Sequence, residues 1–584
     1  MKNLKRALAL VLATACVICC LSACGGSGNN ETKPAETKTT SAETKATSAE
    51  TKAPETTEAE PLFPLKEQIT FRIGLKGNKI DDDFVETCDW LQKLEQQTNI
   101  KVELVNLGDD PITTLNGMLA SGSKNDRLDA LIGCVNDTQL CELAYGGFLT
   151  PLEDYIKNAE LMPNFQTALE EQPAILGAMT APDGHIYSMA RYDANSGGSL
   201  EAPLVINKEW LAKAGLKEIK TTDDLHTYLV YVRDHDMNGD GNPNDEVPLL
   251  LATSTGSAYS HLQSMLPMWG IATKDAALDS YTTIHDGKVA LAPTTAAYKD
   301  AIKTIAAWQK EGLLWSEQYT ANATSYKAKL NNEVQQWGAV FNGFELAVTT
   351  KYFDQLAMVP VPAAPGYTAR VYVNPGIMGY KNCFTVFKQC ENPEAMMAWF
   401  DLWLDEDAYL DQYNWTPEQV KKYGFNAMYE MDDKGNVTYA TLTQEQKDAN
   451  TAVKEKNNLT RWDDSGAASY TWMRSKETYE RGIMKLTGLV TMRNDCYEAY
   501  KAAGILNPEI WPRPYFTQEV SDQIAQYRTD CYALISAYEA KWVTNQSSID
   551  ADWDAFQAAL KTAGVEELTK LLQSAYDTYQ AGLK

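Results

Sequence analysis

Positive charge is scarce in this chain. Its 584 residues include 52 Lys and Arg against 78 Asp and Glu, which gives a formal net charge of −26. Removal of residues 1–23, which carry three positive and no negative charges, would change this to −29. A protein with this large negative charge repels polyanions. We therefore exclude nucleic acid as a partner.

Signatures of catalysis are also missing. No Gly-x-Ser-x-Gly elbow occurs, and no motif singles out a pair of acids of the kind that a glycosidase needs. The five histidines do not have the spacing of zinc ligands; they are His185, His226, His235, His261 and His285. We therefore predict that the protein is not an enzyme and has no catalytic residues.

Cysteine is sparse outside the N-terminal region. Four of the eleven cysteines fall within residues 16–24, which leaves seven in the body. An odd number at this low density excludes a disulfide scaffold and leaves at least one thiol unpaired. The seven are Cys88, Cys134, Cys141, Cys383, Cys390, Cys496 and Cys531.

Aromatic residues are absent from residues 25–61. This segment repeats Glu-Thr-Lys from Glu31, Glu36, Glu43 and Glu50, with Ser, Ala and Pro between the repeats. It cannot bury enough apolar surface to offset the entropy of ordering the chain. Residues 24–61 are therefore predicted to be a disordered linker.

The N-terminus has the features of a lipoprotein signal. Lys2, Lys5 and Arg6 precede an apolar run from residue 7 to residue 21, and the sequence Leu-Ser-Ala-Cys ends at Cys24. The alternatives are a membrane-spanning anchor, for which the run is short of the required 20 residues or so, and ordinary secretion. We predict a signal peptide over 1–23. Diacylglycerol on Cys24, with a further acyl chain such as palmitate on its amine, would anchor the protein on the extracellular face of the cell membrane.

Alternating strands and helices follow the linker. Residues 68–74, 100–107 and 128–133 have the pattern of strands, whereas 81–98 and 112–119 have helical spacing. This order predicts an α/β lobe whose sheet is mostly parallel. Ligands of such sheets bind beyond the carboxyl ends of the strands. Here those ends are the loops 76–78 and 134–137, which include Asn136; capping of the following helix is the alternative role for that residue.

A second lobe is predicted to begin at the strand 203–207, after the flexible stretch 192–198. The chain is expected to cross back near 340–343 and 358–361, so that several crossings form a hinge. From Glu394 onward the sequence is strongly helical. Lobe 1 is thus predicted to contain 62–195 and about 345–393, and lobe 2 about 196–344 and 394–584.

Oxygen-bearing side chains alternate along residues 234–246 in the manner of an EF-hand calcium loop. Two registers are open, one beginning at Asp234 and one at Asp236. An Asx-rich turn without metal is the alternative. A bound calcium would be structural, since the loop supplies the ligands itself. The candidate ligands are Asp236, Asn238, Asp240, Asn242 through its carbonyl, Asp245 and Glu246.

Together these features resemble the family 1 extracellular solute-binding proteins, the lipid-anchored receptors of bacterial ABC importers, and especially their large carbohydrate-binding lipoproteins. No single motif carries the resemblance, but their order behind a lipoprotein signal does. The segments are 146–155 (GGFLTPLEDY), 183–187 (DGHIY), 205–211 (VINKEWL), 236–248, 309–313 (QKEGL), 392–394 (NPE), 550–556 and 573–579.

The resemblance implies a two-lobed periplasmic-binding-protein-like fold with a hinge and a helical C-terminal part. The lobes would close on a solute, and the closed form would dock on ABC permease subunits in the membrane. Similar members carry a calcium loop in the second lobe; here the loop is one residue longer before Asp245. We expect a carbohydrate ligand, most simply an oligosaccharide, and a monomeric receptor. A peptide or other non-sugar solute, or a surface adhesin without import, remains an alternative.

Sugar-binding clefts favour aromatic platforms with polar side chains at their edges. The candidates for ligand contact are Trp269, Tyr192, Asp193, Asn136 and Phe344, with Trp462 and Trp472 further along the chain. Burial in a core is the alternative for each aromatic. Trp399 and Trp403 are one helical turn apart, as are Trp553 and Phe556, and these four are predicted to be core residues.

Overall fold

The protein is described from a computed structural model in which residues 61–584 form one compact unit separate from 1–60. The structure describes residues 61–77, 80, 83–195, 203–252, 261–272, 281–341, 351–372, 381–484, 488–509, 511 and 514–583. The signal peptide, Cys24, the linker up to residue 60 and Phe344 lie outside this part. None of the described helices is long and apolar enough to span a bilayer.

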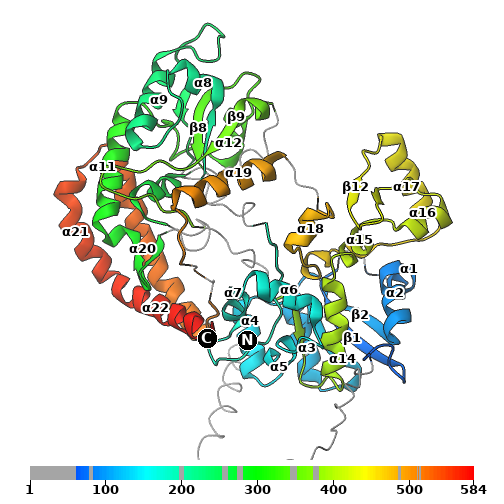
Figure 1. The fold of residues 1–584 in the computed structure, drawn as a ribbon. Helices are drawn as coiled ribbons and strands as arrows, with labels where there is room; N and C mark the ends of the chain where they lie inside the picture. Colours follow the sequence, from blue (N-terminus) through cyan, green and yellow to red (C-terminus); the bar gives the residue numbers. More distant parts are fainter. Residues whose placement is uncertain are drawn as a thin grey trace, which may run out of the picture. The chain divides into compact units, whose positions relative to one another are not determined.

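The first sheet confirms the three predicted N-terminal strands (Figure 1). β1 runs parallel to β2 and to β3, with Ile69 opposite Ile100 and Leu75 opposite Ile132. A fourth strand, β10, pairs antiparallel with β3. In spatial order the strands are β10 (Phe384–Val386), β3 (Ala130–Ile132), β1 (Ile69–Leu75) and β2 (Ile100–Asn106).

The predicted helix 81–98 is interrupted at Cys88. That residue has an extended backbone and forms a β-bridge with Thr460, which separates α1 (Phe84–Thr87) from α2 (Asp89–Thr98). The other helices before residue 195 are α3 (Pro111–Ser121), α4 (Asp137–Tyr145), α5 (Glu153–Ile156), α6 (Pro163–Glu171) and α7 (Ala174–Met179).

The second sheet is mostly antiparallel. β4, the strand predicted at 203–207, pairs antiparallel with both β8 and β9, and only β5 and β8 are parallel. In spatial order the strands are β5 (Val247–Leu249), β8 (Trp337–Phe341), β4 (Leu204–Asn207) and β9 (Leu356–Val359). Around them lie α8 (Lys208–Lys213), α9 (Thr222–Asp234), the 3-10 helix Leu262–Trp269, the hairpin β6 (Thr282–His285) and β7 (Lys288–Leu291), α11 (Ala296–Lys310) and α12 (Ala323–Leu330).

The boundaries predicted for the lobes require two corrections. Residues 356–359 form β9 in the second sheet, although they were expected after the crossing back to the first lobe. The helical segment after residue 393 begins in the first lobe, because Trp399, Trp403 and Trp462 belong to the core that also holds β1 and β3. Pairing and packing with elements hundreds of residues away decide both assignments.

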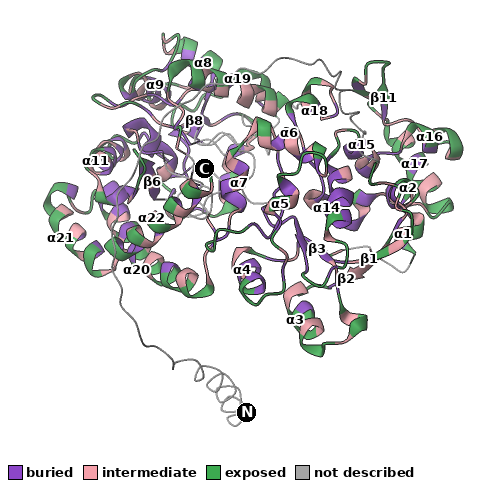
Figure 2. Ribbon diagram, turned by 60° about the horizontal axis from the view of Figure 1, so that its bottom comes forward, coloured by how far each residue is buried: buried purple, intermediate pink, exposed green. Residues whose placement is uncertain are grey.

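The helices after residue 393 belong to more than one core. α14 packs in the first core and residues of α19 to α22 join the second, whereas α15 also packs in a smaller cluster with β11 and β12. Figure 2 shows buried residues along the sheet strands and an exposed outer face on α20 and α21. The elements are α14 (Pro393–Asp401), α15 (Ala408–Tyr413), α16 (Pro417–Tyr423), β11 (Tyr429–Met431), β12 (Val437–Tyr439), α17 (Gln444–Lys456), α18 (Lys476–Glu480), α19 (Gly488–Ala503), α20 (Gln518–Val543), α21 (Ile549–Thr562) and α22 (Val565–Gly582).

The predictions about cysteines and core aromatics agree with the structure. All seven cysteines of the described part are free. Trp399, Trp403 and Phe556 are at most 1% exposed, and Trp553 packs partly buried against the second core.

Candidate functional site

Two distant segments meet where the chain is about to leave the first lobe for β4. Asp193 and Arg474 form a parallel β-bridge, in which the Ala194 amide donates to the Arg474 carbonyl at 2.7 Å. The Arg474 amide in turn donates to the Tyr192 carbonyl at 3.0 Å. This bridge brings together three of the candidate residues, namely Tyr192, Asp193 and Trp472.

Two guanidinium groups lie against Trp472. The central carbon of Arg191 is 4.1 Å from the centroid of the indole, and that of Arg474 is 3.7 Å away, both within cation–π distance. Trp472 is also only 4% exposed. It therefore offers little surface to a sugar in this structure, and it holds the two arginines in place.

Asp193 is the more accessible member of the cluster. Its Oδ1 accepts from the Tyr479 hydroxyl at 2.6 Å and from the Asn195 amide at 3.0 Å, whereas Oδ2 has a 3.4 Å contact with Arg474. Its side chain is 25% exposed. Tyr192, by contrast, is buried, and its hydroxyl donates to Glu171 at 3.0 Å. Burial, followed by the nearby Glu171 charge, raises the pKa of the Tyr192 hydroxyl, which therefore remains a donor at neutral pH.

Asn136 caps α4. Its Oδ1 accepts from the Gln139 amide at 2.9 Å, and the Gln139 side chain accepts from the Asn136 amide at 3.0 Å, which completes a capping box. The neighbouring Asp137 forms an ion pair with Lys381 at 3.0 Å. Lys381 also lies 3.5 Å from the Tyr515 ring centroid. Sequence reasoning missed Lys381 and Tyr515 because no local pattern connects them to residue 137.

Trp269 and Trp462 are both buried. Trp269 ends the 3-10 helix in the second core and is 3% exposed. Trp462 has no exposed surface, and its indole donates to the Thr471 hydroxyl at 2.7 Å. A side chain without surface cannot touch a ligand, so we leave Trp462 out of the proposed site. Phe344 lies outside the described residues.

The candidate calcium loop follows α9, and hydrogen bonds between its own side chains and backbone amides hold its turn. Asp236 accepts from the amides of Gly239 and Gly241, at 2.6 and 2.9 Å. Both glycines have positive φ, of 79° and 92°, a conformation that other residues adopt at a cost. The Asn238 side chain accepts from the Asp240 amide at 2.9 Å. The loop thus gathers oxygen atoms around a tight turn.

The end of the loop contains two buried oxygens without a hydrogen-bond donor. Glu246 Oε1 accepts from the Met237 amide at 2.7 Å, while Glu246 Oε2 and Asp245 Oδ1 have no partner. Burial raises the pKa of the Glu246 carboxyl. Asp234 is instead paired with Arg233 at 2.7 Å, which favours the register that begins at Asp236. Uncompensated buried carboxylate oxygens fit a cation, although no group of three His, Cys, Asp or Glu side chains in the described residues converges into a formed metal site.

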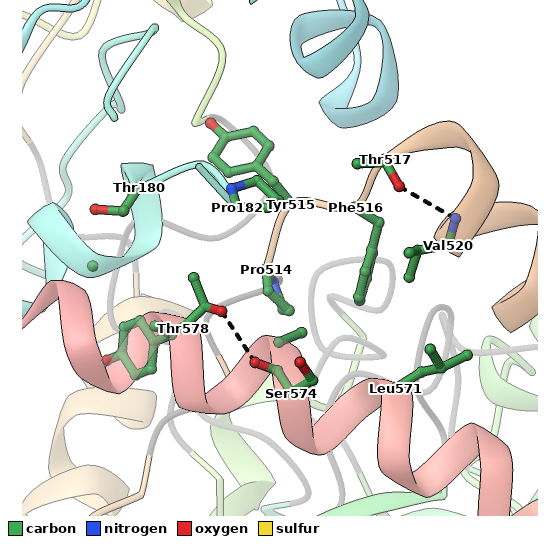
Figure 3. Close-up of a pocket in the computed structure, with 13 residues that line it drawn as sticks. Thr180, Pro182, Pro514, Tyr515, Phe516, Thr517, Val520, Leu571, Ser574 and Thr578 are labelled. Carbon is green, nitrogen blue, oxygen red and sulfur yellow. Dashed lines mark hydrogen bonds between the residues drawn. The ribbon is translucent and has the colours of Figure 1, made fainter. Parts of the chain in front are cut away.

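A cavity of about 130 Å³ lies between α7, α22 and the segment 514–520 (Figure 3). Pro514, Phe516 and Leu571 contribute much of its apolar lining. None of the described residues that line it is charged, and the Thr578 hydroxyl donates to the Ser574 carbonyl at 3.1 Å. None of the candidate ligand residues borders this cavity, so we do not assign the solute to it.

Comparison with known proteins identifies the family. The family model described as bacterial extracellular solute-binding protein matches residues 83–410. The fructooligosaccharide ABC transporter substrate-binding protein FusA of Streptococcus pneumoniae is 27% identical over 527 residues, which cover 89% of this chain and 92% of FusA.

Solved structures give the same fold. S. pneumoniae FusA in complex with kestose matches with a TM-score of 0.60 and 26% identity, over 88% of this chain and 99% of that one. An EF-hand mutant of FusA in complex with fructo-nystose gives a TM-score of 0.57 with the same identity and coverage. An extracellular solute-binding protein from Bifidobacterium longum subsp. infantis gives 0.64 at 20% identity, over 88% and 98% of the two chains. The α/β architecture is thus that of the two-lobed periplasmic-binding-protein-like fold. Since the family model spans more than half of the sequence, the chain belongs to the bacterial extracellular solute-binding protein family.

Proposed function

We propose that this protein is the lipid-anchored substrate-binding component of an ABC importer and that it captures an oligosaccharide. The observation that carries the proposal is the similarity to FusA along nearly the whole of both chains, with the signal and linker sequence in front of it. In this function the protein acts by binding alone and performs no covalent chemistry.

The proposed cycle requires only differential binding. A sugar that makes better contacts in the closed form stabilises that form, which then docks on the permease and releases its cargo. The anchor at Cys24 holds the monomeric receptor on the extracellular face of the membrane, and the linker gives it reach. We propose that the sugar site includes Asp193 and Asn136, with Trp269, Tyr192, Phe344 and Trp472 contacting it directly or supporting those contacts.

Kestose is expected to stabilise the mature protein against unfolding. A ligand that binds only the folded state adds about 2.7 kcal/mol to the free energy of unfolding at 100 times its dissociation constant. Thermal melting of residues 24–584 with calcium, in the presence of kestose, other oligosaccharides, monosaccharides and peptides, measures the shift. A rise with peptides and none with any sugar would contradict the proposal and favour a peptide receptor.

We further propose a structural calcium in the loop, with Asp236, Asn238, Asp240, Asp245 and Glu246 as side-chain ligands and Asn242 as a carbonyl ligand. The support is the pair of buried acceptor oxygens at Asp245 and Glu246, which a divalent cation would compensate. When bound, calcium would supply positive charge that closes the loop between α9 and β5.

Glu246→Gln is expected to raise the apparent dissociation constant for calcium by about 10-fold to 100-fold. The change removes a charged ligand while the side chain keeps its shape. Calcium titration by calorimetry measures the constant, and melting with and without chelator measures the stabilisation. Asp234→Asn is the matched control. Asp234 is paired with Arg233, so its substitution should leave the calcium affinity unchanged. The reverse pattern would assign the other register.

A further inference from the structure

We infer that Asp193 and Arg474 together form hydrogen bonds with a pair of neighbouring hydroxyl groups on the sugar, and that Trp472 positions Arg474 for this contact. The inference rests on the proposed function and names the chemistry of its site. Arg474 was not among the candidates from the sequence, because its partner Asp193 lies 281 positions away.

The location of the pair is set by the backbone. The β-bridge between Asp193 and Arg474 lies in the first lobe, on the segment that leads from α7 to β4. In this fold a residue at the crossing between lobes is next to the region where the solute is held. Both side chains keep some accessible surface, 25% for Asp193 and 19% for Arg474.

The pair has unused hydrogen-bonding capacity. Asp193 Oδ2 has a single contact, the long one of 3.4 Å to Arg474, and 19% of the Arg474 side chain is exposed. A carboxylate only accepts hydrogen bonds and a guanidinium only donates them. Neighbouring sugar hydroxyls, each of which donates and accepts, satisfy both groups at once. The opposite charges also disfavour a strongly ionic ligand of either sign, so the matching ligand is a neutral polyhydroxylated one.

The surroundings hold the pair in place before ligand arrives. The guanidinium of Arg474 lies 3.7 Å from the Trp472 ring centroid, which Arg191 also approaches to 4.1 Å, and it lies 5.3 Å from the Tyr409 ring centroid. The Tyr479 hydroxyl fixes Asp193 at 2.6 Å. Side chains that are already ordered lose less entropy on binding, which raises affinity. Trp472 is thus a positioning residue.

The test variant replaces the planar guanidinium of Arg474 by an ammonium group and keeps the positive charge. Arg474→Lys in the mature chain is expected to weaken kestose binding by 10-fold to 100-fold in calorimetry, because an ammonium cannot reproduce the stacked guanidinium. Arg461→Lys is the matched control. Arg461 lies 5.3 Å from the Trp415 ring centroid, is 20% exposed and donates to the Tyr413 carbonyl, but is not bonded to Asp193. It should leave the affinity unchanged.

Asp193→Asn provides a second variant if Arg474→Lys lowers the melting temperature. The amide keeps the shape and the oxygen that accepts from Tyr479, and it should weaken kestose binding by a similar factor. Wild-type affinity in both variants, or an equal loss in Arg461→Lys, would overturn the inference while the sugar receptor stands. A wild-type protein that binds no sugar would overturn the proposed function instead.

Discussion

Trp403→Ala is expected to lower the free energy of unfolding by about 4 kcal/mol. Trp403 is 1% exposed and is the centre of an aromatic cluster in the first core. Its ring centroid is 4.8 Å from that of Trp462, 5.2 Å from that of Trp399 and 5.6 Å from that of Trp90, in edge-to-face arrangements. Removal of a buried tryptophan costs about 3–5 kcal/mol through lost burial and a residual cavity. The lost aromatic pairs add to this cost.

Denaturant unfolding of wild type and variant measures this loss. Trp403→Phe should cost less than half as much, because it keeps a ring and also removes a buried indole N–H that has no hydrogen-bond partner. Phe148→Ala is the control for the loss of an aromatic ring, since Phe148 is 42% exposed and should change the free energy of unfolding by less than about 0.5 kcal/mol. A similar loss in Phe148→Ala and Trp403→Ala would show that the cluster is not a core.

The helical spacing of Trp399 and Trp403 was enough to predict their burial. Local patterns also predicted β1, β2, β3 and β4, because alternation and apolar runs depend on neighbours in sequence. They did not predict β10, which has three residues and is fixed by pairing with a strand some 250 positions earlier. The prediction that residues 394–584 all belong to the second lobe was wrong for its first part for the same reason: a helix's apolar face does not specify which core it covers.

The candidate sites show the same division. The candidate calcium loop is a local motif, and in the structure its Asp236 and Asn238 side chains accept hydrogen bonds from the loop's own amides. The proposed sugar site draws on distant segments, so sequence reasoning proposed Tyr192, Asp193 and Trp472 by residue type and did not propose Arg474. It also took Trp472 for a stacking platform, since only the three-dimensional arrangement shows that the ring is buried against two guanidinium groups.

Glu539→Gln is expected to remove a large part of the pH dependence of stability. Glu539 is 2% exposed in α20, and its carboxyl accepts from the hydroxyls of Tyr281 at 2.8 Å and Tyr298 at 2.5 Å. Burial raises its pKa from 4.5 to about 7, and the two tyrosine hydrogen bonds only partly oppose the shift. The folded protein therefore holds a proton between pH 4.5 and 7 that the unfolded chain releases.

Because the folded pKa is raised, stability from this group is fully present below pH 4.5 and is lost as the pH rises through about 7. The whole shift corresponds to about 3 kcal/mol, most of which falls between pH 5 and 8. Chemical denaturation of wild type and variant at both pH values gives the difference. Asp401, whose pKa burial also raises to about 7, contributes equally to both proteins and cancels. Equal pH dependence in the two proteins would show that Glu539 is ionised in the fold, held by its tyrosine donors alone.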